Sequence, residues 1–256
     1  MTDLCIEDRV AVVIGGTSGI GRALAVGLAK NGANVIPAGR RMSEIDATAS
    51  EIEASGRRTL RHAADATKRK SLDSLRDAAL AAFGRVDILI NAAGYTLKEP
   101  TATLSEEKWS ALLDTNLTGV LRACQSFHAC LAGSGRGRII NIASLGSYLS
   151  FHQVAAYCAA KTAILSLTRS LACEWAGENI SVNAIAPGVF PTEMNQRLVT
   201  GTARGKEILM RTPMRRFGKP EELVGVAVML ASDAASFLTG QCIAVDGGYL
   251  ASGVNS

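Results

Sequence analysis

Tyr157 and Lys161 lie four positions apart near the start of a stretch rich in Ala and Leu. On an α-helix, residues with this spacing project from the same face. A free tyrosine has a pKa near ~10, and a neighbouring ammonium group favours the phenolate and lowers that pKa. Such a pair can exchange a proton with a bound molecule. The same spacing also occurs on many helices as a solvated surface pair, so it decides nothing alone.

Two further polar residues stand where they can support proton transfer. Ser144 ends the apolar run at residues 139–143 and precedes Tyr157 by 13 positions. A hydroxyl at the end of a strand can hydrogen-bond a substrate oxygen and stabilise the charge that develops there. Asn116 lies inside an apolar helical stretch, where an amide is unfavourable unless it is hydrogen-bonded. It either supports catalysis or is a buried amide satisfied by neighbouring backbone.

A glycine-rich turn follows the first apolar run of the chain and leads into a helix-forming segment. Glycines let the backbone turn tightly and let a pyrophosphate approach the N–H groups at a helix N-terminus. The strand before the turn and the helix after it make a nucleotide site the favoured interpretation. The expected contacts are Gly15, Thr17, Ser18, Gly19, Ile20 and Gly21.

The residues after the second apolar run predict which nicotinamide cofactor is used. An acidic residue at this point would bind the ribose hydroxyl of NAD, but the chain has Arg40 and Arg41 instead. A guanidinium group presents a fork of donors that matches phosphate oxygens. We therefore expect NADP(H) to be preferred, with NAD(H) possible. The alternative is a solvated arginine pair that opens the next helix.

These residues need a scaffold, and the chain predicts one. Short apolar runs alternate with longer amphipathic stretches, which is typical of βα units around a parallel sheet. We expect an α/β single-domain Rossmann fold over residues 1–256, with a doubly wound, mostly parallel seven-stranded sheet and helices on both faces. The expected strands are Val10–Ile14, Asn34–Ala38, Thr59–Ala63, Asp87–Ile90, Gly137–Ile142, Ser181–Ile185 and Cys242–Val245.

Six helix-like segments separate these strands. An irregular stretch, at about residues 187–220, should lie at the carboxyl edge of the sheet as a substrate loop or lid. The expected helices are Ile20–Asn31, Ser43–Ser55, Lys68–Phe83, Ser105–Ala132, Ala155–Ala176 and Pro220–Ala231.

The spacing Gly-x-x-x-Gly-x-Gly together with Tyr-x-x-x-Lys resembles the short-chain dehydrogenase/reductase family over nearly the whole chain. Ile14 replaces the usual Thr before the glycines, and Ala92 replaces the second Asn of an Asn-Asn-Ala-Gly motif. The resemblance implies hydride transfer between nicotinamide and a carbonyl carbon, with Tyr157 as general acid and base. It makes Asn116, Ser144, Tyr157 and Lys161 the catalytic set, in which Asn116 holds a water that links Lys161 to solvent.

The resemblance also adds cofactor contacts. Asp65 corresponds to an aspartate at the adenine edge, and the stretch at 187–192 corresponds to a clamp around the nicotinamide carboxamide. Val245-Asp246-Gly247-Gly248 resembles the family's C-terminal signature. The added contacts are Asp65, Ala66, Asn91, Ala92, Ala93, Gly94, Tyr157, Lys161, Pro187, Gly188, Val189 and Thr192.

The substrate implied by this resemblance is a sugar acid or polyol, as in gluconate 5-dehydrogenase-like members. A 3-oxoacyl-[acyl-carrier-protein] reductase would use the same catalytic residues, and a non-catalytic nicotinamide-binding regulator is a more remote alternative. The carboxyl-edge loops offer these substrate contacts: Tyr95, Leu145, His152, Gln153, Phe190, Met194 and Arg197.

Composition limits the partners. There are 27 Lys and Arg against 23 Asp and Glu, without a long block of one sign, so neither nucleic acid nor membrane is indicated. No apolar run approaches the ~18 residues of a bilayer span, and the N-terminus lacks the basic start of a signal peptide, which predicts the cytoplasm. Three His and six Cys without ligand spacing predict no metal. Excess apolar residues on the helices at 105–132 and 155–176, with the family resemblance, imply a homotetramer.

Overall fold

A computed structural model describes residues 4–193 and 195–253 of the chain. Its central element is a parallel sheet in the order β2-β1-β3-β4-β5-β6. The chain leaves β1 for β2 on one side and then crosses to β3 on the other. Open α/β sheets bind ligands at such a switch point. The strands are β1 Val10–Ile14, β2 Asn34–Ala38, β3 Ile88–Asn91, β4 Gly137–Ile142, β5 Ile180–Pro187 and β6 Cys242–Val245.

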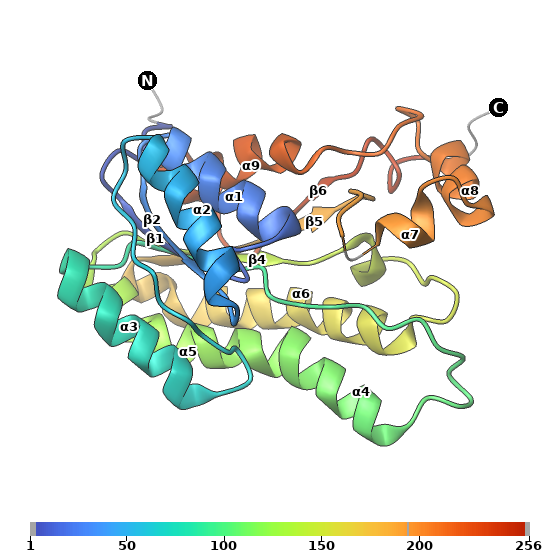
Figure 1. Ribbon diagram of the computed structural model, residues 1–256, viewed down its shortest axis with the longest axis horizontal. Helices are drawn as coiled ribbons and strands as arrows, with labels where there is room; N and C mark the ends of the chain where they lie inside the picture. Colours follow the sequence, from blue (N-terminus) through green and yellow to red (C-terminus); the bar gives the residue numbers. More distant parts are fainter. Residues whose placement is uncertain (1–3, 194, 254–256) are drawn as a thin grey trace.

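Helices cover both faces of this sheet (Figure 1). On one face lie α1 Gly19–Lys30, α2 Met42–Ala54 and α9 Val224–Ala231, and on the other α3 Arg69–Phe83, α5 Gly119–Gly133 and α6 Ala155–Trp175. Alternate residues of β1 join opposite cores: Val12 packs with the α3–α5–α6 side and Val13 with the α1–α9 side. Every residue of β1 is therefore buried, which explains its unbroken apolar sequence. The predicted fold class is confirmed.

The predicted strand count of seven is wrong, because Thr59–Ala63 does not form a ladder. This segment runs beside β2, but only Gly39 and Ala63 form an isolated bridge. Val35 N donates to Arg58 O at 3.1 Å, and Ala64 N donates to Gly39 O at 2.7 Å. Pro37 lies between Val35 and Gly39 on this edge of β2 and has no N–H to donate. The missing donor leaves the segment tied to β2 only near its ends.

The long predicted helix at 105–132 is interrupted near its middle. Helix α4, Glu106–Leu113, passes into a π-helical turn, Asp114–Thr118, before α5 begins. Asn116 lies in this turn, and π-turns inside helices often mark functional sites.

The stretch at 187–220, predicted to be irregular, contains α7 Gln196–Val199 and α8 Ala203–Arg211. The predicted helix at 220–231 begins with a separate 3₁₀ turn. The 3₁₀ turns of the described residues are Leu145–Ser147, Ala176–Glu178, Pro220–Leu223 and Asp233–Ala235.

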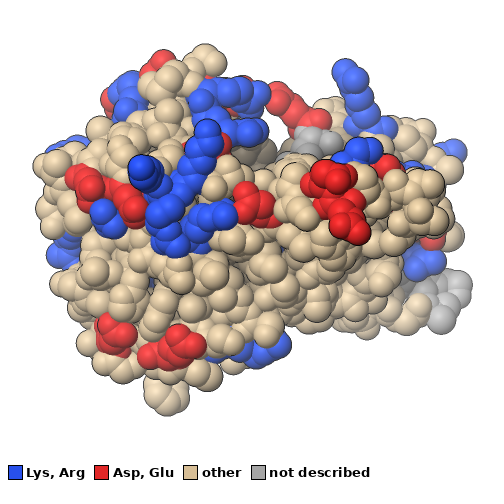
Figure 2. Space-filling view, turned by 90° about the horizontal axis from the view of Figure 1, so that it is seen from below, with Lys and Arg blue, Asp and Glu red and all other residues tan. Residues whose placement is uncertain are grey.

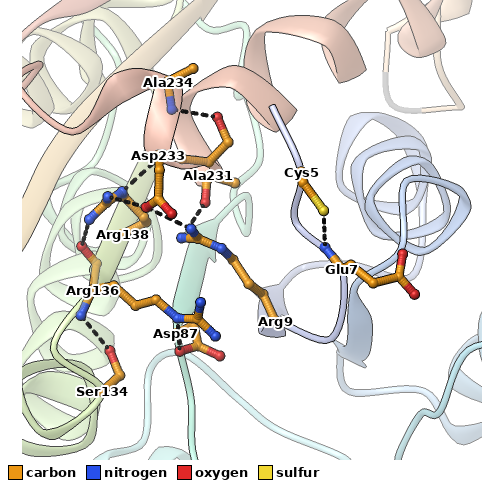
Figure 3. Close-up of polar contacts among 12 residues, drawn as sticks. Cys5, Glu7, Arg9, Asp87, Ser134, Arg136, Arg138, Ala231, Asp233 and Ala234 are labelled. Atoms are coloured by element: carbon orange, nitrogen blue, oxygen red, sulfur yellow. Dashed lines mark hydrogen bonds and ion pairs between the residues drawn. The ribbon is translucent and has the colours of Figure 1, made fainter. Parts of the chain in front are cut away.

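Buried arginines join the segment after α9 to the amino end of the sheet (Figure 3). Arg9, before β1, pairs with Asp233 at 2.7 Å and donates to Ala231 O at 3.0 Å. Arg138, in β4, reaches the same carboxylate at 3.2 Å. The Arg9 and Arg138 side chains are only 2% and 6% exposed. This cluster lies at the end of the sheet opposite the carboxyl edge, so it serves the fold.

No helix within residues 4–193 and 195–253 has the length and apolar character to cross a membrane. Figure 2 shows the side of the molecule that carries α3, α4 and α5. Basic and acidic groups lie next to one another on this face and leave a broad uncharged area. The face therefore presents no continuous basic stripe.

Candidate active site

The end of β4 and the start of α6 bring three of the predicted catalytic residues together. The Tyr157 hydroxyl is hydrogen-bonded to Ser144. Lys161 Nζ donates to the carbonyl oxygen of Ile142, the last residue of β4, at 2.6 Å. Ser147 Oγ donates to Lys161 O at 2.7 Å and fixes the helix against the 3₁₀ turn after Ser144. The residues are therefore held in place by backbone contacts, which is what a proton-transfer site requires.

Burial dominates the electrostatics of this group. Burial raises the pKa of Tyr157, although its hydrogen bond to Ser144 works in the other direction. Burial also lowers the pKa of Lys161 to about 8. Lys161 Nζ lies 5.8 Å from the centroid of the Tyr157 ring and is bound to Ile142 O. The expected lowering of the Tyr157 pKa by this ammonium is therefore not found in the protein alone.

Asn116 lies in the π-turn that packs against α6, and its side-chain amide is hydrogen-bonded to backbone. Its Nδ2 donates to Tyr95 O at 2.8 Å, and its Oδ1 accepts from Tyr95 N at 3.1 Å. The side chain is fully buried. Both ends of the amide are thus used to hold the segment after β3, as the alternative interpretation allowed.

The glycine turn forms a cradle that fits a pyrophosphate. Gly15 has φ +80°, and a Cβ there would lie 2.5 Å from Ala93 N. A Cβ on Gly21 would lie 2.1 Å from Gly15 O. Ser18, the N-cap residue of α1, makes no side-chain cap, so the first N–H groups of the helix are not satisfied by that side chain. A backbone this tightly packed, with donors at a helix start, suits the phosphates of a dinucleotide.

The arginines after β2 differ in their surroundings. Both side chains belong to exposed residues, but Arg40 forms no ion pair within the described part of the chain, whereas Arg41 pairs with Glu44 at 3.3 Å. Burial raises the pKa of Asp65, but hydrogen bonds from Thr67 and the charges of Arg40 and Lys68 outweigh it and lower the pKa. Arg40 thus faces the same region as the predicted adenine contact, with its donors available.

Other predicted cofactor residues fall into two groups. Thr192 lies over the glycine turn, since a Cβ on Gly19 would be 3.2 Å from its Cγ2. Gly188, just after β5, packs so closely on Asp246 that a Cβ would lie 2.6 Å from its Cα. The side chain of Asn91 instead points into the sheet, where Nδ2 donates to Asn141 Oδ1 at 2.9 Å. The backbone of Ala92 and Ala93 and the methyl group of Ala92 border the glycine turn.

The predicted substrate residues are spread over buried and open positions. Leu145 and Phe190 are buried, and the Phe190 ring packs against Gly218 as part of the core. Tyr95, His152 and Arg197 are exposed, whereas Gln153 is partly buried. Met194 lies outside the described residues.

One contact that was not predicted joins α8 to the segment between Ser144 and α6. Arg204, in α8, lies over the ring of Phe151 at 5.9 Å, and Phe151 lies 6.5 Å from Tyr249. The position of a basic residue within the predicted loop at about 187–220 could have indicated Arg204. Nothing in the sequence indicated its partner, because the contact joins two distant segments.

Comparison with known proteins extends these observations. A family model described as "Enoyl-(Acyl carrier protein) reductase" matches residues 15–250. The 2-dehydro-3-deoxy-D-gluconate 5-dehydrogenase of Escherichia coli is 41% identical over 248 residues, which is 96% of this chain and 97% of that protein. The NAD-dependent glycerol dehydrogenase of Listeria innocua is 38% identical and covers 96% of each chain.

A solved structure agrees in fold as well as sequence. The gluconate 5-dehydrogenase of Burkholderia cenocepacia, in complex with NADP and tartrate, is 34% identical with a TM-score of 0.93, over 98% of each chain. The resemblance noted from the glycine turn and Tyr157 is confirmed. This chain belongs to the short-chain dehydrogenase/reductase family of NAD(P)-dependent oxidoreductases that act on CH–OH groups.

Proposed function

We propose that this protein interconverts a secondary alcohol and a ketone on a sugar acid, with NADP(H) as its preferred cofactor. The observation that carries the proposal is the hydrogen-bonded Ser144–Tyr157 pair with Lys161 fixed at the end of β4. Sugar acids are the substrates named for the E. coli and B. cenocepacia relatives. The glycine turn at the same edge of the sheet supplies a place for the cofactor.

The chain's own residues account for the proton. In oxidation, the Tyr157 oxygen removes the proton of the substrate hydroxyl, and in reduction it returns that proton to the carbonyl oxygen. Ser144 Oγ hydrogen-bonds the same oxygen and stabilises the charge on it. Lys161 places a buried ammonium beside Tyr157 and favours the phenolate when it is charged. The nicotinamide, when bound, accepts or donates the hydride.

Arg40 supports the preference for NADP(H). It is exposed and has no ion pair among the described residues, so its guanidinium can pair with a 2′-phosphate. The named cofactors of the relatives include NADP and NAD. The remaining assignments of Asn116, the 187–192 clamp and the substrate loops belong to this proposal.

Two further parts of the proposal concern the molecule's state in the cell. A homotetramer is supported by half-buried apolar residues near α4 and the π-turn, including Trp109, Leu113 and Leu117. Light scattering after size-exclusion chromatography should give four times the chain mass. Cell fractionation should find the protein in the cytoplasm.

One alternative has an observation in its favour. The matching family model carries an acyl-carrier-protein reductase description, and such a reductase would use the same Ser144, Tyr157 and Lys161. A screen of sugar acids, neutral polyols and a 3-oxoacyl carrier-protein substrate, each with NADP(H) and NAD(H), separates the two. We expect turnover of a sugar acid with NADP(H). Turnover confined to the acyl substrate would replace the proposal, and no turnover at all would favour a non-catalytic nicotinamide-binding regulator.

A further inference from the structure

The lid and the catalytic loop meet at one arginine. Helix α8 begins after its N-cap Thr202, and Arg204 stands in its first turn. The Arg204 guanidinium lies 5.9 Å from the ring centroid of Phe151. Phe151 belongs to the segment between Ser144 and the start of α6, which we call the catalytic loop. Figure 1 shows α7 and α8 at the same end of the molecule as this loop.

Hydrogen bonds and a ring contact hold this loop to the neighbouring segments. Gln153 adopts a left-handed backbone conformation with φ +62°, and its carbonyl oxygen accepts from Glu99 N at 2.8 Å. The Tyr148 hydroxyl is hydrogen-bonded to Cys242 of β6. The Phe151 ring also lies 6.5 Å from the Tyr249 ring, in the segment after β6. Arg204 is therefore held at a defined place beside the catalytic loop rather than free in solvent.

No carboxylate of the described residues pairs with the charge of Arg204. It forms no ion pair among residues 4–193 and 195–253, and its side chain is partly buried. Arg211, at the other end of the same helix, is exposed and pairs with Glu207 at 2.9 Å. Near the catalytic loop, the Glu99 carboxylate is taken by Lys108 at 2.7 Å. Arg204 thus keeps a positive charge at the site's edge that an acidic ligand can balance.

The contact with Phe151 also leaves the N–H donors of Arg204 available. A guanidinium that lies over an aromatic ring uses its face for that contact and directs its N–H donors outward in its plane. Two parallel N–H groups match the two oxygens of a carboxylate. A sugar acid carries such a carboxylate together with the hydroxyl that is oxidised, whereas a polyol does not.

We propose that Arg204 is the residue that selects sugar acids over neutral polyols, by binding the substrate carboxylate while the Phe151 ring holds its guanidinium. This rests on the proposed sugar-acid function. It deepens that function by assigning a specificity residue that lies in the lid and takes no part in proton transfer.

The test compares Arg204→Gln with Arg211→Gln, the same substitution at the other end of α8. Each purified variant is assayed with gluconate and with gluconamide, its neutral amide, using NADP⁺. We expect Arg204→Gln to lower kcat/KM for gluconate by about 10-fold to 100-fold, mainly through KM, because a charge-assisted pair is lost. Gluconamide should change by less than about threefold in the same variant. Arg211→Gln should match the wild type on both.

The outcomes distinguish the role of Arg204 from the proposed sugar-acid dehydrogenase function. Equal losses on gluconate and gluconamide, or no loss on either, would overturn the role of Arg204 while leaving a sugar-acid dehydrogenase. If the wild type oxidises no sugar acid, the proposed function fails and this inference fails with it. Melting temperatures of the variants show whether α8 still folds. Arg204→Lys should recover part of the gluconate activity, because it restores the charge without the planar fork.

Discussion

Lys161 Nζ and the carbonyl oxygen of Ile142 form a buried hydrogen bond of 2.6 Å that ties α6 to the end of β4. Within residues 4–193 and 195–253 no carboxylate forms an ion pair with this ammonium, and burial lowers the pKa of Lys161 to about 8. Lys161 therefore loses its charge within the range in which dehydrogenases are assayed. The catalysed reaction should therefore depend on pH over this range.

The two directions of the reaction should respond oppositely to pH. Burial raises the pKa of Tyr157, so the residue is a phenol at neutral pH and can donate its proton to a carbonyl. We expect kcat/KM for oxidation to rise between about pH 6 and 9, and kcat/KM for reduction to fall at the upper end. Full pH profiles in both directions check this. An oxidation rate that falls over that range would be inconsistent with Tyr157 as the base.

Replacing Lys161 with Met should separate activity from stability. Activity should fall by at least about 100-fold, because the phenolate of Tyr157 loses its nearby positive charge. Stability should not fall in the same way, since a buried lysine without a carboxylate partner costs desolvation energy. Chemical denaturation measures the unfolding free energy, with Lys70→Met as an exposed control. A large loss of stability in Lys161→Met would show that its hydrogen bond to Ile142 outweighs its desolvation.

The same residue gives a pH dependence of folding. The folded pKa of Lys161, about 8, lies below the ordinary 10.5 of the unfolded chain. Between these values the unfolded state binds the proton that the folded state has lost. The contribution of Lys161 to the unfolding free energy therefore rises with pH in this window and is lost as pH falls.

Arg40→Ala should weaken the use of NADP⁺ selectively. Loss of a charged pair with the 2′-phosphate should raise KM for NADP⁺ by about 10-fold to 100-fold, whereas KM for NAD⁺ should change little. Arg41→Ala is the matched control, because Arg41 is exposed and pairs with Glu44. Equal effects of Arg40→Ala on KM for both cofactors would mean that Arg40 does not bind the 2′-phosphate of NADP⁺.

Asp233→Asn should destabilise the fold without reaching the active site. Hydrogen bonding from Arg9, together with the charges of Arg138 and Arg136, lowers the pKa of Asp233 against the opposing effect of burial. Its removal leaves the buried Arg9 and Arg138 without their anion. Because the Asp233 side chain is 53% exposed, we expect a loss of about 2 kcal/mol, less than for a fully buried pair.

Denaturant unfolding at neutral pH measures this loss, with Asp77→Asn as the control on a surface pair. The contribution of Asp233 is present above the ordinary carboxyl pKa and disappears as pH falls through its lowered folded value. A wild-type stability equal to that of Asp233→Asn at neutral pH would show that the pair contributes nothing.

Local signals allowed much of this structure to be predicted. The apolar runs of β1 and β4 and the glycine turn at 15–21 can each be predicted from a few neighbouring residues. Tyr157 and Lys161 are fixed by helical spacing, and Ser144 by its place at the end of a strand. Each of these depends on backbone geometry that the neighbouring sequence determines.

Features that depend on distant segments could not be predicted from the local sequence. Thr59–Ala63 reads as a strand, but Pro37 in the neighbouring strand lacks the donor that a ladder requires. The Asn116 amide is hydrogen-bonded to the Tyr95 backbone, and the contact of Arg204 with Phe151 arises only when α8 packs against the segment that contains Phe151. Such contacts depend on tertiary packing, which cannot be predicted from a local sequence pattern.

The most direct test is kcat/KM for a sugar acid with NADP⁺ in the wild type and in Tyr157→Phe, which keeps the ring and removes the hydroxyl. We predict turnover in the wild type and a loss of about 10²-fold to 10⁴-fold in the variant, the range of general acid–base catalysis. Binding of NADPH, followed by its fluorescence, should persist in the variant. Equal activity of the two proteins would contradict the assignment of Tyr157 as the proton-transfer residue.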